Sequence, residues 1–260
     1  MKNRFAPFAD SGSDDDGRKR VTGTATAADV ANIDHDCAPL QDTASRTHQR
    51  AWRPPDEAPF DYYAVLDFEC TCDDTVQQFS HEIIEFPVVF LNSRTFEIDF
   101  EFHCYVRPVE IPRLTTFCTK LTGIEQADVK DAETLENVLL SFDRFLAANS
   151  LVWRRADRSP DQHLFAICSD GPWDIQKFLR PECQRKRIVL RQYPYWFDHW
   201  IDVRAACAQV LHKPKCGIAG MLEYLGMEFC GRQHSGLDDA RNIARILQAL
   251  LERGFQPSVS

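Results

Sequence analysis

The sequence predicts a mixed α/β fold in which a central sheet is flanked by helices. Three apolar runs between residues 62 and 106 follow one another closely and have strand-like composition, which is typical of an antiparallel meander. Helical periodicity then alternates with a short apolar strand up to residue 253. A meander followed by such α/β units predicts a sheet with both antiparallel and parallel pairs.

Each strand of the meander has its own signal. Residues 62–68 form a short, β-rich apolar run, which predicts a buried strand. Residues 83–91 form a second run, and Pro87 inside it predicts a bulge or an edge because proline lacks an N–H. Residues 96–106 alternate between apolar and polar side chains and predict a half-buried strand, which the prolines at 108 and 112 follow.

The second half of the chain predicts helices around one further strand. Residues 164–168 are the strand, a short apolar run. The last helix is the clearest, with one apolar face and Gly254 after it as a stop signal. The predicted helices cover residues 135–146, 174–179, 201–211, 218–225 and 240–251.

Three segments are expected along the chain. Residues 1–59 have few large apolar side chains and cannot offset their ordering entropy, so we expect a disordered segment and linker that is available to protein partners. Residues 60–254 form the ordered domain, which we expect to be monomeric. Residues 255–260 form a C-terminal tail.

Composition points to an intracellular protein of the cytoplasm, the nucleus or both. No apolar run approaches the roughly 18 residues of a membrane span, and the amino terminus lacks an apolar signal core. Acids at residues 14–16 argue against a mitochondrial transit peptide. The 10 cysteines are then most simply reduced thiols.

The net charge of −9 argues against a protein that coats nucleic acid by charge alone. It allows an enzyme that acts on nucleic acid through bound metal, because cations reverse the local sign. Residues 185–187 with Arg180 and Arg191 are either a solvated helix face or a strip that binds the nucleic-acid backbone. A zinc site is a further alternative, with ligands drawn from His212, Cys216, Cys230 and His234.

Two carboxylates follow the first predicted strand. Asp67 and Glu69 are two residues apart, so on a strand both side chains project from the same face. Two carboxylates this close repel each other unless a cation lies between them. The alternative is an acidic strand end that faces water, but the buried run before Asp67 favours a functional pair.

A third acid follows the predicted strand at 164–168. Asp170 lies in a Gly-Pro turn, where aspartate is common for structural reasons. Asp174 follows Trp173 at the start of a predicted helix and can face back toward the sheet. These positions favour Asp174 over Asp170 as a metal ligand.

The start of the last helix supplies a fourth acid and a histidine. Asp239 precedes Ala240 on the buried face, whereas Asp238 is turned about 100° away. The helix dipole alone also favours acids in a first turn. His234 lies five residues before Asp239 in a glycine-bounded loop, which makes it a candidate general base.

Four carboxylates and one histidine are a donor set for phosphodiester hydrolysis. Hard oxygen ligands favour Mg²⁺, for which Mn²⁺ can substitute. Two such ions about 4 Å apart can stabilise both the attacking and the leaving oxygen of an in-line displacement. His234 would take the proton from the attacking water.

These motifs together resemble the DEDDh exonucleases, a DnaQ-like branch of the ribonuclease H-like fold, and within it the Eri-type (three-prime histone mRNA exonuclease) subfamily. The resemblance covers about residues 60–253. It is carried by residues 67–72 (DFECTC), 81–89 (HEIIEFPVV), Phe117-Cys118, 121–124 (LTGI), 170–174 (DGPWD) and 231–244 (GRQHSGLDDARNIA).

The resemblance implies a 3′-to-5′ exonuclease that uses two Mg²⁺ ions and releases nucleoside 5′-monophosphates from RNA with a free 3′ end. It implies Asp67, Glu69, Asp174 and Asp239 as metal ligands and His234 as the general base, with Glu69 also catalytic.

The resemblance also implies contacts with the terminal nucleotide. Phe117 and Trp173 occupy the positions of the aromatic side chains that hold the terminal base, although core packing is an equal alternative for Phe117. Cys70 would lie near the terminal ribose, where a 2′-hydroxyl contact favours RNA.

Two other functions stay open. One is a DNA-directed 3′-to-5′ exonuclease, and the other is a catalytically silent RNA-binding scaffold, against which the presence of all five motif residues argues. Histone-mRNA members carry a SAP domain before the nuclease, and residues 1–59 do not read as one. The physiological RNA is therefore not predicted.

Overall fold

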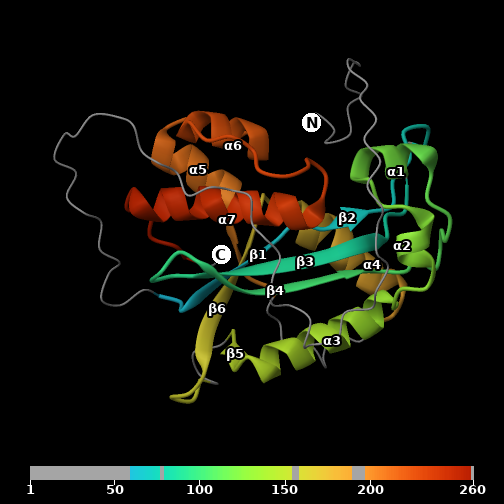
Figure 1. The fold of residues 1–260 in the computed structure, drawn as a ribbon, viewed down its shortest axis with the longest axis horizontal. Coiled ribbons are helices and arrows are strands. Elements are labelled where there is room, and N and C mark those ends of the chain that lie inside the picture. The colour runs from blue at the N-terminus through green and yellow to red at the C-terminus, as the bar shows by residue number, and fades with distance from the viewer. Residues whose placement is uncertain (1–58, 77–78, 154–157, 189–196, 259–260) are drawn as a thin grey trace. The chain divides into compact units, whose positions relative to one another are not determined.

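The computed structural model of the chain describes residues 59–76, 79–153, 158–188 and 197–258. The predicted disorder of residues 1–59 falls almost wholly outside these ranges. The described residues form a seven-stranded mixed sheet with helices on both faces, so the predicted fold class is confirmed (Figure 1). No helix in the described ranges is long and apolar enough to cross a membrane.

The meander forms the first half of the sheet. Strand β1 (Tyr62–Leu66) pairs antiparallel with β3 (Ile83–Asn92), which pairs antiparallel with β4 (Ile98–Tyr105). A two-residue strand, β2 (Glu69–Cys70), extends the line of β1 along β3. The three predicted strands are therefore present, with small differences at their ends.

Pro87 lies in a central strand, so the predicted edge is wrong. The ladder between β1 and β3 ends at Leu66 opposite Val88, and the β2 ladder begins at Glu69 opposite Glu85. Pro87 thus lies opposite the interruption between the two short strands, where the absence of its N–H coincides with a break in pairing. The irregularity between β3 and β4 falls at Phe90 and Leu91, not at Pro87.

Parallel strands complete the sheet. Strand β6 (His163–Ser169) pairs parallel with β1, and β5 (Leu151–Val152) and β7 (Trp200–Asp202) pair parallel with β6. Because β1 and β6 run in the same direction, the residues that follow both strands meet at one edge of the sheet. That edge carries the candidate site.

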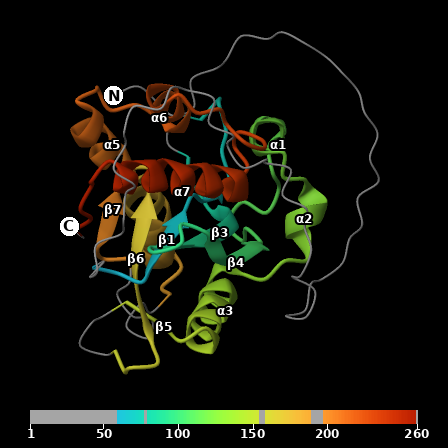
Figure 2. The ribbon, with the colours of Figure 1, turned by 60° about the vertical axis from the view of Figure 1, so that its left-hand side comes forward.

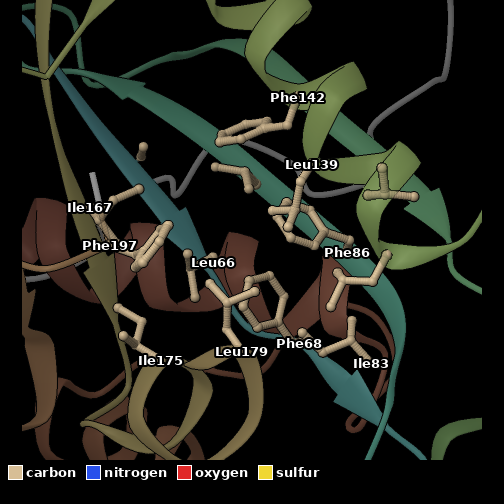
Figure 3. Close-up of a cluster of buried hydrophobic side chains, with 14 of the residues drawn as sticks. Leu66, Phe68, Ile83, Phe86, Leu139, Phe142, Ile167, Ile175, Leu179 and Phe197 are labelled. Carbon is tan, nitrogen blue, oxygen red and sulfur yellow. The ribbon is translucent and has the colours of Figure 1, made fainter. Parts of the chain in front are cut away.

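One face of the sheet is covered by α3 (Leu135–Ala148), the π-helical segment η2 (Trp173–Leu179) and α4 (Arg180–Arg185). Figure 3 shows the apolar side chains on this face, where Leu66 of β1 and Phe68 after it belong to the same cluster as Phe142 of α3 and Leu179 of η2. Alternate residues of β4 also turn to this face and pack against it: Phe100, Phe102 and Cys104.

The opposite face is covered by α5 (Val203–Leu211), α6 (Ile218–Leu225) and α7 (Gly236–Glu252). Helix α7 lies directly along β3 and β1, as both ribbon views show (Figures 1 and 2). The predicted helix at 201–211 is correct except at its start, because Ile201 belongs to β7 and Asp202 accepts a hydrogen bond from Ala205 N as the helix cap.

Two helices had no counterpart in the prediction. They are α1 (Thr116–Thr122) and α2 (Gln126–Lys130). Both lie between the meander and α3, beyond the two prolines. Thr115 caps the start of α1, because its hydroxyl accepts a hydrogen bond from Cys118 N, and Gly123 caps the end in a left-handed conformation.

Candidate active site

The site lies where the chain leaves β1 and enters β2. Asp67 is fully buried in the interruption between these strands, and Glu69 is buried in β2. Phe68 between them packs against Phe86 on the α3 face, with ring centroids 4.6 Å apart. The alternation of side chains along an extended segment directs Asp67 and Glu69 away from that core.

The N-terminal end of α7 approaches this segment from the other face. The carboxylates of Glu69 and Asp239 and a ring nitrogen of His234 have ligand atoms that all lie within 4.8 Å of one another. Among the described histidines, cysteines and acids, no other set of three meets this criterion, and Asp67 and Asp174 lie outside the set. The arrangement permits His234 to act as a metal ligand or as a base.

Asp174 reaches the same segment from η2. Its Oδ1 accepts a hydrogen bond of 2.9 Å from Phe68 N, the backbone group between Asp67 and Glu69. Asp174 is fully buried. The structure thus brings this carboxylate against the backbone between the first two acids, although Asp174 and Phe68 are 106 residues apart in sequence.

The two neighbouring aspartates have structural partners. Asp170 forms a two-fold ion pair with Arg204, with Nε–Oδ1 and Nη2–Oδ2 distances of 2.8 and 2.6 Å. Asp238 accepts a hydrogen bond of 2.9 Å from Arg232 N and lies 3.6 Å from Arg241 Nη1. These contacts agree with the choice of Asp174 and Asp239 as the candidate ligands.

His234 is held in an unusual backbone conformation. Its φ of 61° lies in the left-handed region, which costs a residue with a Cβ roughly 1–2 kcal/mol. The N–H of His234 donates to Asp239 Oδ2 at 2.8 Å, and Asp239 N donates to the carbonyl of Ser235. One candidate ligand therefore also fixes the backbone of the candidate base.

Glu85 anchors α7 to the sheet, a role that the sequence analysis missed. This buried β3 residue accepts hydrogen bonds from Gly236 N at 2.9 Å and Leu237 N at 3.4 Å, and lies 2.9 Å from His103 Nε2. It caps a helix whose own cap residue, Ser235, makes no side-chain cap bond. The sequence signal that could have indicated this role is an acid inside an otherwise apolar strand.

Gly236 permits the close approach of α7. A Cβ at this position would lie 2.5 Å from the backbone oxygen of Asp67 and 3.2 Å from Glu85 Oε2. Any larger residue would push the helix away from β1 and β2. The glycine thus sets the distance between the strand acids and the acid of the helix.

The three candidate substrate contacts occupy different positions. Trp173 is 37% exposed next to Asp174, with Lys177 Nζ 5.6 Å from its ring. Phe117 is half-buried on α1. The side chain of Cys70 is buried, so only its backbone could contact a ribose.

A thiol and a hydroxyl join α1 to β2 and the residues after it. Cys118 Sγ donates to the carbonyl of Cys70 at 3.7 Å, and Thr115 Oγ1 donates to the carbonyl of Cys72 at 2.6 Å. The hydrogen bond from the Cys72 thiol lowers the pKa of Cys118, while the same bond and burial raise the pKa of Cys72. Helix α1, which carries Phe117, is thereby fixed beside Glu69 and Cys70.

The zinc alternative does not fit the geometry, and most of the basic strip forms ion pairs within the domain. In the described part of the chain the ligand atom of His234 groups with Glu69 and Asp239, and no zinc set forms from it and the nearby cysteines. The basic strip is largely engaged within the domain: Lys186 pairs with Glu82 and Glu182, Arg185 with Glu110, and Arg180 with Asp198. Arg191 lies outside the described residues.

Comparison with known proteins adds independent support. Residues 64–247 match the RNase_T family model, described as an exonuclease. The chain is 39% identical over 200 residues to rat 3′-5′ exoribonuclease 1 and 41% identical over 198 residues to bovine ERI1 exoribonuclease 3. These matches cover 76% and 75% of the chain, which spans about half the length of the curated relatives it matches.

Solved structures agree with the sequence matches. The nuclease domain of 3′hExo, a DEDDh family member bound to rAMP, is 37% identical with a TM-score of 0.70, and the match covers 77% of this chain and 96% of that domain. A 3′-exonuclease that recognises the histone mRNA stem-loop is 36% identical with a TM-score of 0.71, over 78% of this chain and 68% of that one. The predicted ribonuclease H-like fold is confirmed. The chain belongs to the RNase_T exonuclease family, as a relative of its DEDDh members.

Proposed function

We propose that the chain is a metal-dependent 3′-to-5′ exoribonuclease that releases nucleoside 5′-monophosphates from RNA 3′ ends. The observation that carries this proposal is the convergence of Glu69, His234 and Asp239 within 4.8 Å. The acids come from a strand and a helix 170 residues apart, and Asp174 reaches the same segment through Phe68 N. The names of the relatives, exoribonucleases, support the same activity.

The donor set fits a pair of divalent ions. DEDDh exonucleases depend on divalent metals, and buried carboxylates are the ligands that Mg²⁺ and Mn²⁺ prefer. Asp67, Glu69, Asp174 and Asp239 would hold them. When bound, the two ions would neutralise charge on the phosphate and stabilise the attacking and leaving oxygens.

His234 is proposed to take a proton from the attacking water at a ring nitrogen. The neutral imidazole suits this role near neutral pH, and a positioned base contributes about 10²–10⁴-fold to a rate. Asp239 accepts a hydrogen bond from the backbone N–H of His234. The ligand atoms of Glu69, Asp239 and His234 lie within 4.8 Å of one another. The base is thereby kept beside the acids that bind the metal.

The end of the strand is proposed to stack between Trp173 and Phe117. The partial exposure of Trp173 beside a fully buried acid supports this role, because core packing does not account for an open indole. Stacking contributes roughly 1–3 kcal/mol per base and accepts any base. The backbone at Cys70 would contact the 2′-hydroxyl and favour RNA over DNA.

The remaining proposals concern the protein as a whole. We propose that residues 60–254 act as a monomeric nuclease domain, that the chain works inside the cell, and that residues 1–59 are available to protein partners. One solved relative recognises a histone mRNA stem-loop. The similarity to that relative does not identify the physiological RNA of this chain.

A paired digestion tests the proposed function. RNA and DNA oligonucleotides of the same sequence, labelled at the 5′ end, are incubated with the full chain and Mg²⁺. We expect a ladder that shortens from the 3′ end and proceeds faster on RNA. Faster digestion of the DNA would contradict the RNA assignment, and cleavage at internal positions would contradict the exonuclease assignment.

A further inference from the structure

The loop that carries His234 has an anchor on a distant helix. The guanidinium of Arg232 donates to the carbonyls of Lys120 and Leu121 at 3.3 Å and to that of Thr122. These three carbonyls belong to the last turn of α1, about 110 residues earlier in the chain. On its other side, Arg232 N donates to Asp238 Oδ2 at 2.9 Å.

The end of α1 is suited to this contact. The last carbonyls of a helix lack partners within the helix and carry partial negative charge, which a guanidinium complements. Gly123 ends α1 with a φ of 71°, and a Cβ there would collide with the guanidinium of Arg232. The planar fork of an arginine can reach several carbonyls at once, whereas a lysine ammonium cannot.

Helix α1 is also fixed at the opposite side of the site. Cys118 donates to the carbonyl of Cys70, which directly follows Glu69, and Thr115 donates to that of Cys72. Arg232 therefore completes a connection that runs from β2 through α1 to the loop of His234. The same helix carries Phe117.

The loop needs such a restraint because His234 has a strained backbone. A non-glycine residue in the left-handed region persists only when its surroundings hold it there. Asp239 supplies one contact to His234 N, and Arg232 fixes the chain two residues earlier. We propose that Arg232 is a positioning residue for His234, and that it couples the candidate base to the helix that carries Phe117.

This inference rests on the proposed function and is tested through turnover of a labelled RNA oligonucleotide. Arg232→Ala should lower kcat about 10²-fold, because a displacement of about 1 Å at a reacting group costs that much. Arg232→Lys should restore part of the loss, since one ammonium can reach one carbonyl. Arg253→Ala is the matched control, because Arg253 binds the carbonyl of Ala249 at the far end of α7 and should leave kcat unchanged.

A double-mutant cycle separates positioning from a general structural role. In a His234→Ala background, Arg232→Ala should lower kcat less than 2-fold further, because its effect acts through the missing imidazole. An equal 10²-fold loss in both backgrounds, or no loss in either, would overturn the proposal. If Arg232→Ala does not fold, the same comparison with Arg232→Lys decides.

The experiment distinguishes a failure of the proposed function from a failure of the positioning role of Arg232. A wild-type chain that releases no nucleotide from RNA would sink the proposed function and this inference together. An active wild type with additive effects of the two substitutions would sink the inference alone. Hydrogen exchange at residues 116–123 gives a second readout, and unchanged protection in Arg232→Ala would also contradict the connection.

Discussion

Asp170 and Asp174 are four residues apart, yet their surroundings differ completely. Asp170 balances Arg204 in a two-fold ion pair, whereas Asp174 is buried against the backbone between Asp67 and Glu69. The charge of Asp170 is thus used within the fold. The buried position of Asp174 against the backbone between Asp67 and Glu69 agrees with its predicted role as a metal ligand, which stays a prediction.

This difference predicts opposite effects of the same substitution. Asp174→Asn should lower turnover about 10³-fold with little loss of stability, because several kcal/mol of transition-state charge stabilisation are lost. Asp170→Asn should lower the free energy of unfolding by about 3 kcal/mol, because it removes the buried negative charge that binds Arg204 through two hydrogen bonds, while the folded fraction keeps its turnover. Denaturant titration measures the stability of each variant, and steady-state assays measure its turnover. A stability loss in Asp174→Asn and a turnover loss in Asp170→Asn would refute the choice of Asp174 as the ligand.

The buried positions of three candidate site residues could be predicted from local signals. Asp67 and Glu69 follow a buried strand two residues apart, and Asp239 faces the buried side of a periodic helix. Glu85 is marked locally only as an acid inside an apolar strand, and Arg232 has no such signal. Their partners lie 151 and 110 residues away and could not be predicted from a local pattern. Whether the predicted ligands bind metal stays a prediction.

At the scale of elements, the contact between α7 and the strand ends decides the geometry of the site. Gly236→Ala should destabilise the protein by roughly 1–3 kcal/mol and lower turnover, because its Cβ would lie 2.5 Å from the carbonyl of Asp67. Gly217→Ala is the control, since its Cβ would meet only Arg204 Nη2 at 3.9 Å. The unfolding temperature and turnover should change for Gly236→Ala alone. Equal changes in both variants would argue against this packing.

A buried ion cluster joins α4 to the start of β3. Lys186 lies 2.7 Å from Glu82 and 2.5 Å from Glu182, and both carboxylates are fully buried. Burial opposes the charge on Lys186, but the two carboxylates outweigh it and raise its pKa. Burial likewise opposes the charge on Glu82, while Lys186 and three backbone N–H groups hold its pKa below the usual value. Burial raises the pKa of Glu182.

Lys186→Met should therefore cost about 3–5 kcal/mol at neutral pH, because it leaves two buried carboxylates without a cation. In the wild type, the contribution of Glu82 is present above pH 4.5 and is lost as the pH falls through its lowered pKa. That of Lys186 is present below pH 10.5 and is lost as the pH rises through its raised pKa. The raised pKa of Glu182 has the opposite effect on stability: this residue favours the folded state more as the pH falls.

In the variant, the unpaired acids bind a proton more readily, so the deficit should shrink as the pH falls. Urea titrations between pH 4 and pH 8 measure this trend. Arg187→Met, the same change at an exposed neighbouring residue, should show neither the deficit nor the trend. A deficit independent of pH would contradict the charge explanation.

The elements that sequence reasoning missed are short. Helices α1 and α2 have seven and five residues, too few for a helical repeat to appear, and strands β2, β5 and β7 have two, two and three. Their positions depend on tertiary contacts such as the thiol of Cys118 on Cys70. The long helices α3 and α7 show several turns of a single apolar face and were predicted.

At the scale of the whole molecule, parallel pairing brings the site together. Strands β1 and β6 run in the same direction, so Asp67 and the segment 170–174 leave the sheet at the same edge. Composition and periodicity predicted the mixed sheet. They could not show that β6 pairs with β1, because the paired residues lie about 100 positions apart in the sequence.

The central claim is that these converging acids and His234 form one metal-dependent nuclease centre. The most direct test measures nucleotide release from a 3′-labelled RNA by the full chain and by Asp67→Ala, with Mg²⁺ and with a chelator. We predict nucleoside 5′-monophosphate from the wild type only with Mg²⁺, and release from Asp67→Ala that is slower by about 10³-fold. Release by Asp67→Ala at the wild-type rate would contradict the account.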